Sequence, residues 1–530
     1  MKKEIDLIVS PREASNHETL RKIIAHKIGL KESDSFSFQL IKRSVDARSR
    51  SIKINLRLDV FIDEELPTTV SASNNYLNVK DKKSVIIIGA GPAGLFAALQ
   101  FIELGLKPII IERGKTVRNR RRDLAAIHKQ HIVHPDSNYC FGEGGAGTYS
   151  DGKLYTRSTK KGDVKKILNT FVEFGAEPII SVDAHPHIGT NKLPKIIENI
   201  REKIIACGGE IHFNERMVDF EINENKITKV ISKNTETHTT QEWKGEAVLL
   251  ATGHSARDIF ELLNDKEILV EAKTFAMGVR VEHPQSLIDK MQYHCSTEND
   301  VEEIRNYLPA AAYSWVEQID GKGVYSFCMC PGGIIVPCAT GAEQVVTNGW
   351  SPSKRNNPFA NSGIVVTVEE EDWKHHSQHK ALAALRYQQE IEKIAFVAGG
   401  KTQTAPAQRL LDFVNGKTSA TLPSCSYQPG IISAPLHELL PANIALRLRK
   451  AFALVEKKMK GYLTNDAVIV AVESRTSSPV RIPRDKELLH HPQITNLYPC
   501  GEGAGYAGGI ISAALDGQLC AIKIFEKKEA

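Results

Sequence analysis

The chain has 530 residues, of which 42% are hydrophobic and 25% charged, with a formal net charge of +5 at pH 7. This composition is typical of a globular protein of several domains, and the charge is too small to indicate nucleic acid as the main partner. No run approaches the roughly 18 apolar residues that a membrane-spanning helix needs, and Glu4 and Asp6 interrupt any apolar core of a signal peptide. We therefore expect a cytoplasmic protein with no membrane span.

Residues 1–80 are predicted to form a small N-terminal α/β domain. We expect three strands and one helix in it, at residues 4–10, 35–42, 51–61 and 17–30. Its basic side consists of Arg43, Arg48, Arg50, Lys53 and Arg57. A solvated sheet face explains this side, and an RNA-binding face is the alternative. The polar stretch 67–83 is interpreted as a linker.

From residue 84 the chain reads as strand, glycine turn, helix and strand within about thirty residues, the length of one βαβ unit. The turn Gly89-Ala90-Gly91-Pro92-Ala93-Gly94 has the G-x-G-x-x-G spacing of a dinucleotide-binding fingerprint. Gly89 permits the tight turn, Gly91 lets a pyrophosphate approach the backbone, and Gly94 lets the helix pack on the strand. Glu112 ends the second strand, where a carboxylate accepts hydrogen bonds from a ribose. A tight turn without a ligand is the alternative, but the strand and helix around it favour a bound dinucleotide.

A basic run follows Glu112 directly: Arg113, Lys115, Arg118, Arg120, Arg121 and Arg122. One arginine is expected to contact the cofactor pyrophosphate, and the others to face water.

The middle of the chain alternates helical and β-rich segments. Helices are predicted at 163–175, 192–208, 379–400 and 443–461, and strands within 210–222, 227–233, 237–245, 247–253, 279–284 and 333–339. The polar stretch 350–363 is predicted to be a long loop. The strand at 247–253 ends in Ala251-Thr252-Gly253 and is expected to pass near the cofactor.

The C-terminal region decides between FAD and NAD. Residues 496–510 read as a strand, a glycine loop and the start of a small-residue helix. NAD does not need a second helix N-terminus about 400 residues after the first. FAD does, because its ribityl chain, inner phosphate and flavin extend toward one.

These segments together resemble FAD-dependent oxidoreductases of the kind that includes glutathione reductase and p-hydroxybenzoate hydroxylase. The likeness is greater to a poorly characterised bacterial set of FAD-dependent, or NAD(FAD)-utilising, dehydrogenases. It rests on four further stretches, at residues 141–153, 399–413, 473–484 and 501–509. The resemblance implies a fold and a cofactor, not a substrate. A glutathione reductase would carry a second fingerprint for NADPH and a redox cysteine pair in the helix after the first fingerprint, and this chain has neither.

The stretch FGEGGAGTYSDGK, residues 141–153, has five glycines in thirteen positions. In such folds the segment after the second strand returns beneath the flavin. We therefore interpret it as a loop whose backbone contacts FAD, with Thr148 and the N–H groups of 144–147 as donors. A glycine-rich turn that does not touch FAD is the alternative.

Five further side chains are candidates to face the flavin: His254, Cys328, Cys330, Glu473 and Arg475. For each, a structural or cofactor-contact role is preferred to a catalytic one. Glu473 is expected to pair with Arg475, which could hold an anionic substrate. The nine cysteines form no C-x-x-C pair and are expected to be free thiols, with Cys328 and Cys330 packed on a strand. No metal site is predicted.

The predicted fold class is α/β, with a doubly wound Rossmann-like FAD domain, an inserted mixed-sheet substrate domain and the small N-terminal domain. The FAD domain is assigned to 84–162, 208–262 and 490–530, and the substrate domain to 163–207 and 263–489. The residues predicted to bind FAD are Gly89, Ala90, Gly91, Pro92, Ala93, Gly94, Glu112, Arg113, Gly114, Gly144, Gly145, Gly147, Thr148, Met217, Val218, Ala251, Thr252, Gly253, Gly501, Glu502, Gly503, Gly508, Gly509 and Ile510.

The expected function is an FAD-dependent oxidoreductase that moves a hydride or an electron pair through flavin N5 to or from a small-molecule substrate. NAD(P)H, where it is used, binds transiently, and nucleic acid is not expected as a partner. A flavin-dependent RNA-modifying enzyme and a non-catalytic FAD-binding protein are the alternatives. Catalytic residues and the oligomeric state receive no prediction.

Overall fold

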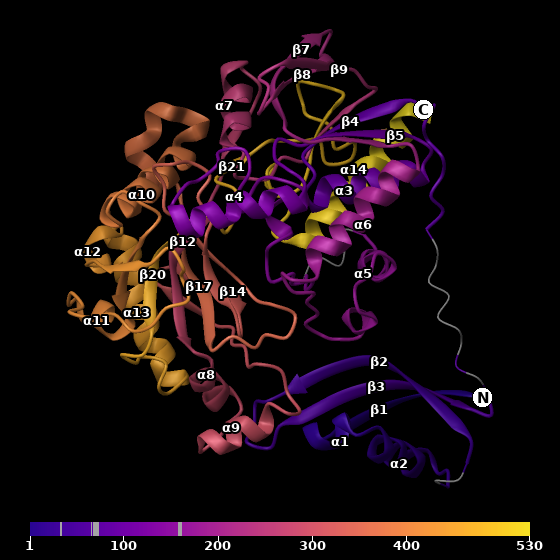
Figure 1. Cartoon of the computed structure of the whole chain (residues 1–530), viewed down its shortest axis with the longest axis vertical. Coiled ribbons are helices and arrows are strands. Elements are labelled where there is room, and N and C mark those ends of the chain that lie inside the picture. The colour runs from indigo at the N-terminus through magenta and orange to yellow at the C-terminus, as the bar shows by residue number, and fades with distance from the viewer. Residues whose placement is uncertain (32–33, 65, 67–73, 157–161, 530) are drawn as a thin grey trace.

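The computed structural model describes residues 1–31, 34–64, 66, 74–156 and 162–529, and three units are visible in it (Figure 1). A parallel sheet with its helices lies at the top of the view, a larger mixed sheet at the left, and the N-terminal unit at the bottom. Part of the expected linker, residues 67–73, lies outside the described residues. No helix of the described chain is long and apolar enough to cross a membrane.

The parallel sheet has five strands. In spatial order they are β22 (Leu497–Pro499), β10 (Val248–Leu250), β4 (Ser84–Ile88), β5 (Lys107–Ile111) and β6 (Glu210–His212). Every neighbouring pair is parallel. Both faces of such a sheet are covered, which explains why β4 and β5 are almost uniformly apolar.

Alternate residues of β4 belong to different cores. Val85 and Ile87 pack with α3 (Pro92–Glu103), α5 (Val164–Glu173), α6 (Leu193–Ala206) and α14 (Ile510–Glu529). Ile86 and Ile88 pack on the other face, against α7 (Arg257–Asp265) and an antiparallel sheet of β7 (Glu215–Asn223), β8 (Lys226–Asn234) and β9 (Thr240–Trp243). The period of two along a strand thus places helices on both sides of the sheet.

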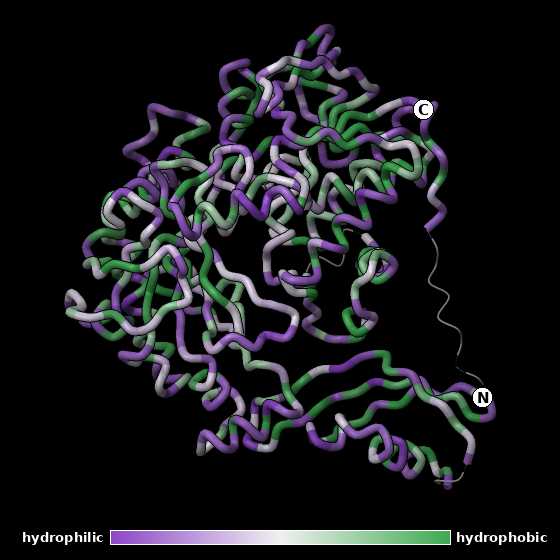
Figure 2. Tube along the Cα trace, viewed as in Figure 1, coloured by the Kyte–Doolittle hydropathy of each residue, from purple (hydrophilic) through white to green (hydrophobic). Residues whose placement is uncertain are grey.

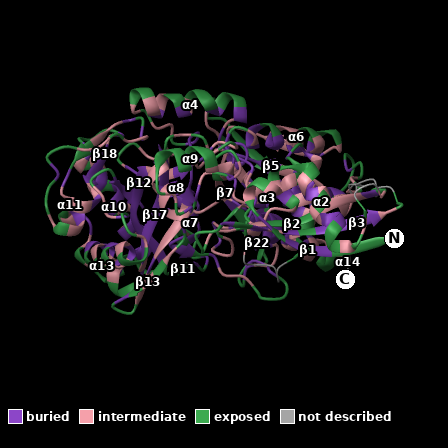
Figure 3. Ribbon diagram, turned by 90° about the horizontal axis from the view of Figure 1, so that it is seen from below, coloured by how far each residue is buried: buried purple, intermediate pink, exposed green. Residues whose placement is uncertain are grey.

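The position of α5 and α6 differs from the sequence-based division, which placed residues 163–207 in the substrate domain. Ile167 and Phe171 of α5, and Ile196 and Ile200 of α6, are buried in the same core as Val85. Their apolar faces match α3 and α14, so these helices belong to the parallel-sheet unit. Helix α4 (Val117–Gln130) lies further out, and its outer face is largely exposed (Figure 3).

The mixed sheet has seven strands. In spatial order they are β13 (Val316–Ile319), β14 (Lys322–Cys330), β17 (Phe359–Val368), β12 (Phe275–Pro284), β20 (Val468–Glu473), β18 (Ala405–Arg409) and β19 (Ile431–Ser433). All neighbours are antiparallel except β18 and β19. The central strands β12 and β17 are buried (Figure 3).

Smaller elements surround this sheet. They are α8 (Gln285–Gln292), α9 (Glu298–Ile304), the 3-10 segment η4 (Glu370–Leu382), α10 (Ala383–Ala398), α11 (Leu410–Asn415), α12 (Leu436–Leu439), α13 (Ala442–Lys458), and two strand pairs, β15 (Ile334–Pro337) with β16 (Thr347–Trp350) and β11 (Glu271–Ala272) with β21 (Val480–Arg481).

The expected loop at 350–363 is wrong in its second half, because β17 begins at Phe359. Asn361 and Ser362 are fully buried there, and Asn361 Oδ1 accepts a hydrogen bond from Arg280 Nη1 at 2.9 Å. The polar composition that indicated a loop belongs to a strand whose buried Asn361 pairs with Arg280 through its side-chain oxygen.

The N-terminal unit is a three-stranded antiparallel sheet in the order β1 (Lys2–Val9), β3 (Lys53–Ile62), β2 (Phe36–Asp46), with α1 (Pro11–Ser15) and α2 (His17–Ile28). Hydrophobic and hydrophilic residues alternate along its strands, whereas β4 and β5 are more uniformly hydrophobic (Figure 2). The unit is tied to the rest of the chain through β2: Arg43 N–H donates to Val182 O and Arg43 O accepts from Ala184 N–H, both at 2.9 Å.

Candidate functional site

A large cavity, with a volume of about 1870 Å³, lies where the three units meet. Its wall includes the fingerprint turn after β4, the 145–153 stretch, the loop before α14, parts of the mixed-sheet unit, and residues of β2. Small-molecule sites usually have about 300–1,000 Å³. The volume is therefore large enough for a dinucleotide and a second molecule.

The turn at Gly89–Gly94 is shaped by close backbone contacts on one side and open space on the other. A Cβ on Gly89 would lie 2.6 Å from Ala251 O, and one on Gly94 would lie 2.0 Å from Gly89 O. A Cβ on Gly91 would meet nothing within 4 Å, and Gly91 lines the cavity. Gly91 is also the N-cap of α3, and no side chain caps that helix. The free N–H groups and the positive end of the α3 dipole are available to a phosphate.

Glu112 lines the cavity and ties three turns together. Its carboxylate accepts hydrogen bonds from the N–H groups of Ala90 at 2.8 Å, Gly114 at 2.9 Å and Gly142 at 3.0 Å. A carboxylate has about four acceptor positions, so one remains for a ribose hydroxyl. Its structural role was not visible in the sequence.

The glycine-rich stretch 141–153 lies directly against the fingerprint turn. Gly144 N–H donates to Ala90 O at 2.9 Å, and a Cβ on Gly145 would lie 3.2 Å from Gly91 Cα. Gly145 and Gly147 line the cavity. The Thr148 hydroxyl is fully buried and donates to Glu143 O at 2.7 Å, so it holds the loop and does not face the cavity.

Arg120 explains how this loop keeps its shape. Its guanidinium is fully buried and donates to the carbonyl oxygens of Asn138, Tyr139, Glu143 and Gly145 at 2.6–3.0 Å. The expectation that all but one arginine of the basic run face water is wrong here. A buried arginine that satisfies four carbonyl groups has the same sequence signature as an exposed one.

The helix α14 contributes a second N-terminus. Gly508 and Gly509 precede it, line the cavity, and leave open space where a Cβ would stand. Gly253, after β10, also lines the cavity and leaves open space at its Cβ position. Two helix N-termini and glycines that expose backbone N–H groups on one cavity fit a long, twice-phosphorylated cofactor such as FAD.

The structure places most of the predicted FAD-binding residues on the cavity wall. These are Gly89, Gly91, Pro92, Ala93, Glu112, Arg113, Gly145, Gly147, Met217, Ala251, Thr252, Gly253, Gly501, Glu502, Gly508, Gly509 and Ile510. The remaining predicted residues do not line it: Ala90, Gly94, Gly114, Gly144, Thr148, Val218 and Gly503.

Arg475 lines the cavity, but its donors are already used. Its guanidinium forms two bonds of 3.1 Å to Glu392 and donates to Ser255 and Thr340 at 3.2 and 2.8 Å, and to Gln344 at 2.8 Å. The expected role as the holder of an anionic substrate has no free donor to support it.

Glu473 does not pair with Arg475, as the sequence had indicated. It forms a bidentate ion pair with the fully buried Arg280, with both N–O distances at 2.8 Å. Of the other three candidates, His254 and Cys328 line the cavity, and Cys330 is fully buried beside it.

Lys153 is a residue whose role sequence reasoning missed. It lines the cavity, its ammonium group lies 3.8 Å from Cys328 Sγ, and it donates a hydrogen bond to Met329 O. Burial would lower the pKa of Lys153, but the charges of Cys328, Cys330 and Asp151 hold it above its ordinary value. The only signal in the sequence was a charged residue in the glycine-rich stretch 141–153. Its role was missed because its partner, Cys328, is 175 residues away.

The basic side of the N-terminal unit is largely neutralised. Arg43 pairs with Asp183 at 2.8 Å, Arg48 with Asp46 at 2.6 Å, and Arg57 with Asp6 at 2.9 Å. Such pairs leave little net positive charge for a phosphate backbone. This arrangement favours a solvated sheet face over an RNA-binding face.

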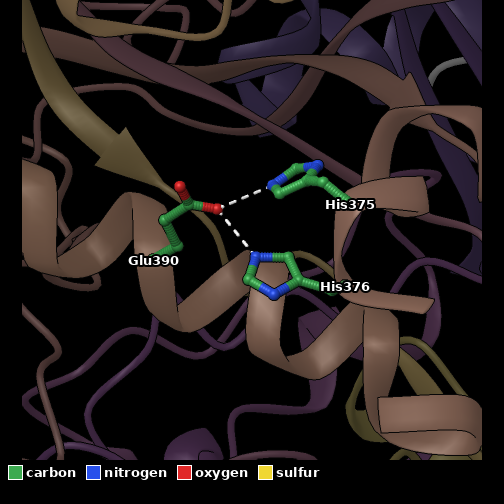
Figure 4. Close-up of side chains that lie close together, drawn as sticks. All are labelled: His375, His376 and Glu390. Atoms are coloured by element: carbon green, nitrogen blue, oxygen red, sulfur yellow. Dashed lines mark hydrogen bonds and ion pairs between the residues drawn. The ribbon is translucent and has the colours of Figure 1, made fainter. Parts of the chain in front are cut away.

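A separate cluster of His375, His376 and Glu390 lies outside the cavity, between η4 and α10 (Figure 4). Both imidazoles reach the same carboxylate oxygen, from Nε2 at 3.0 and 2.8 Å. These bonds connect η4 to α10, so a structural role explains the cluster.

Comparisons with known proteins agree with the cofactor site. Residues 83–270 match the pyridine nucleotide-disulphide oxidoreductase family, and residues 274–476 match the family described as FAD-dependent protein, C-terminal domain-like. Residues 1–61 match a domain of unknown function. An uncharacterised protein of Clostridium beijerinckii is 37% identical over 527 residues, which are 96% of each chain.

Solved structures with a similar arrangement are distant. An Escherichia coli quinol fumarate reductase subunit is 12% identical, with 85% of this chain and 71% of that chain covered and a TM-score of 0.34. A flavin-dependent brominase is 11% identical, with 85% and 80% covered and a TM-score of 0.37. Likenesses at this level say nothing about the reaction of this chain.

Proposed function

Because the chain belongs, with its clostridial relative, to a family of FAD-dependent proteins, we propose that it is an oxidoreductase whose FAD exchanges a hydride or an electron pair with a small, largely apolar substrate. One observation carries this proposal. The cavity that contains the dinucleotide turn continues without a break to side chains of the mixed-sheet unit. A protein that held FAD only as a structural ligand would not need this additional space.

The part of the cavity wall beyond the cofactor turns indicates the class of substrate. It includes Tyr293, Leu308, Tyr313, Phe327 and Met329. Aromatic and apolar side chains with few polar groups are typical of sites for small organic molecules. Charged groups on this part of the wall include Asp151, Lys153, Arg305 and Arg355.

FAD supplies the redox chemistry when it is bound. The residues of the chain would bind and orient it: the N-termini of α3 and α14 would hold its phosphates, and Glu112 would offer an acceptor to a ribose hydroxyl. Lys153 is positioned to hold or donate a proton beside the substrate. Arg475 fixes the wall through its bonds to Glu392.

NAD(P)H, where it serves as donor, is proposed to dock without a Rossmann domain of its own. In the described part of residues 263–489 the sheet is antiparallel apart from the β18–β19 pair, and no G-x-G-x-x-G sequence follows any of its strands. The G-x-G-x-x-G turn at Gly89–Gly94 is used for the ADP half of FAD.

The proposal is tested by purifying the protein and recording its absorbance spectrum, followed by anaerobic stopped-flow reduction with NADH, NADPH and a panel of small metabolites. We expect a yellow protein whose flavin is bleached by at least one donor. A colourless protein that does not take up FAD would contradict the cofactor. A bound flavin that no reductant bleaches would indicate a non-catalytic flavoprotein.

A further inference from the structure

Cys328 and Cys330 lie at the end of β14, where the strand is deformed. Cys328 lines the cavity, and Cys330 is fully buried. The pairing of β14 with β17 shifts register between Phe327 and Cys330, and Cys328 has a φ of +50°. Such a conformation is costly for a residue with a side chain, and bulges of this kind often re-aim a side chain near a site.

The two sulfurs differ in their surroundings. The Cys330 thiol donates a hydrogen bond to the Cys328 carbonyl oxygen at 3.5 Å, and Lys153 Nζ lies 3.8 Å from the Cys328 sulfur. The interaction with the neighbouring Cys330 thiol, and the charges of Lys153 and Arg280, outweigh burial and lower the pKa of Cys328. The pKa of Cys330 is raised, first by its interaction with Cys328 and then by burial. The two pKa values are thus shifted in opposite directions, which favours ionisation of Cys328 before Cys330.

The charged groups around the pair include both signs. Besides Lys153 and Arg280 they are Asp151, Arg355 and Glu473. Asp151 is almost fully buried, lines the same cavity, and uses one oxygen to bind Arg355 at 3.0 Å. Its other oxygen, Oδ1, has no hydrogen-bond partner among the described residues. This buried oxygen is therefore available to accept a hydrogen bond from a water or a ligand in the cavity.

Two cysteines elsewhere in the chain show what packing alone produces. Cys500 is fully buried near Cys520 and Asp516, and burial raises its pKa. Arg484 there binds Asp516 at 2.7 Å and donates to Cys520 Sγ at 3.4 Å, but burial outweighs its charge at Cys500. Cys328 differs because it is not fully buried and has the Lys153 ammonium group 3.8 Å from its sulfur.

We propose that Cys328 and Cys330 form a redox-active dithiol that exchanges an electron pair with FAD, an inference that rests on the function proposed above. In the oxidative direction the S–H bond of Cys330 breaks and one S–S bond forms between the two cysteines. The Cys328 thiolate, the Cys330 thiol and oxidised FAD become a disulfide and reduced FAD, which takes up the electron pair and the Cys330 proton. The reverse step returns the pair to the two sulfurs. The chain thus holds a second two-electron carrier beside the flavin.

Anaerobic reductive titration of the holoprotein tests the proposal by counting electrons. The wild type is expected to take up twice as many electrons per FAD as Cys328→Ser or Cys330→Ser. Cys207→Ser, which removes a thiol at the end of α6, should behave as the wild type. Equal electron uptake by the wild type and both serine variants, with normal flavin reduction, would overturn the dithiol and leave the proposed function intact.

A second measurement does not depend on the flavin's activity. Alkylation of the full-length wild type with iodoacetamide near pH 6, followed by peptide mass mapping, should modify Cys328 at least about tenfold faster than Cys207, whose pKa is raised by burial. Lys153→Met should slow the reaction at Cys328, and Lys153→Arg should largely preserve it. Alkylation of Cys328 no faster than that of Cys207 would contradict the proposal, even if the serine variants failed to fold. A colourless protein would instead contradict the proposed function.

Discussion

Gly145 stands against Gly91, with the Cβ position of Gly145 only 3.2 Å from Gly91 Cα. Two glycines that are 54 positions apart thus form one continuous backbone surface on the cavity wall. The contact couples the 141–153 loop to the fingerprint turn. A change in either segment is therefore expected to affect the binding of FAD more than the folding of the sheet.

Replacement of Gly91 should remove FAD binding and leave the fold intact. A Cβ at Gly91 meets no protein atom within 4 Å, so a side chain there enters only the space left for the pyrophosphate. We expect Gly91→Val to weaken FAD binding by about 100-fold or more, equivalent to about 2.7 kcal/mol. Flavin fluorescence titration of the apoprotein measures this, and far-UV circular dichroism checks the fold. Gly323→Ala, whose Cβ would make ordinary contacts on β14, is the control. Unchanged affinity in Gly91→Val would place the cofactor elsewhere.

Arg120→Lys should loosen the loop that supports the cofactor. A lysine ammonium group has three donors and cannot reproduce the bonds of the buried guanidinium to four carbonyl groups. Buried carbonyl oxygens left without a partner cost roughly 1–3 kcal/mol each. We expect a lower melting temperature and an FAD affinity reduced at least about tenfold. Arg122→Lys, at an exposed position two residues away, should change neither quantity. Equal melting temperatures for the two variants would show that Arg120 does not hold the loop.

Local patterns could be predicted from the sequence, because their physical causes are local. The strand of Val85–Ile88, the turn at Gly89–Gly94 and the helix that follows need only about twenty residues to specify them. The second helix start at Gly508–Ile510 was found in the same way. The cofactor was predictable because both signals lie in short, contiguous stretches.

Features that depend on distant partners were missed. The polar residues Asn361 and Ser362 indicated a loop. Only the structure shows that they lie in a buried strand beside Arg280. Arg120 is not distinguished from its exposed neighbours until the carbonyl groups of the 138–145 loop are placed around it. The roles of Lys153 and Cys328 depend on their contact with each other, and the two residues are 175 positions apart. Tertiary contacts of this kind leave no periodicity in a single sequence.

The buried cluster of Arg257, Glu392 and Arg475 should make stability depend on pH. Glu392 binds Arg257 at 2.8 Å and Arg475 at 3.1 Å. Burial alone would raise the pKa of Glu392, but the charges of the two arginines outweigh it and lower the pKa to about 2. The carboxylate pKa in an unfolded chain is about 4.3. The stabilisation is therefore fully present above about pH 5 and is lost as the pH falls toward 2.

Glu392→Gln measures this contribution. The variant leaves two buried guanidinium groups without their carboxylate, which typically costs about 3–5 kcal/mol. We expect a clearly lower melting temperature than the wild type at pH 7, and a difference that shrinks below pH 4. Glu390→Gln, two residues along α10 on its exposed side, is the matched control and should show a much smaller effect. A melting-temperature difference that stayed constant down to pH 3 would contradict the pKa assignment.

NAD(P)H is expected to reach the flavin without a binding domain of its own. A dedicated nicotinamide domain would require a second strand–turn–helix unit with a reader for the 2′-hydroxyl or 2′-phosphate group. The described mixed sheet is antiparallel around β12, β17 and β20, so it offers no carboxyl edge of parallel strands for such a unit. We therefore expect any reduction by NADH or NADPH to require high concentrations, with the observed rate rising nearly linearly over the range tested. Isothermal titration should detect no tight binding to the oxidised holoprotein. Submicromolar affinity for NAD(P)H without turnover, or an ordered NAD(P) molecule on a second βαβ unit within residues 263–489, would contradict this arrangement.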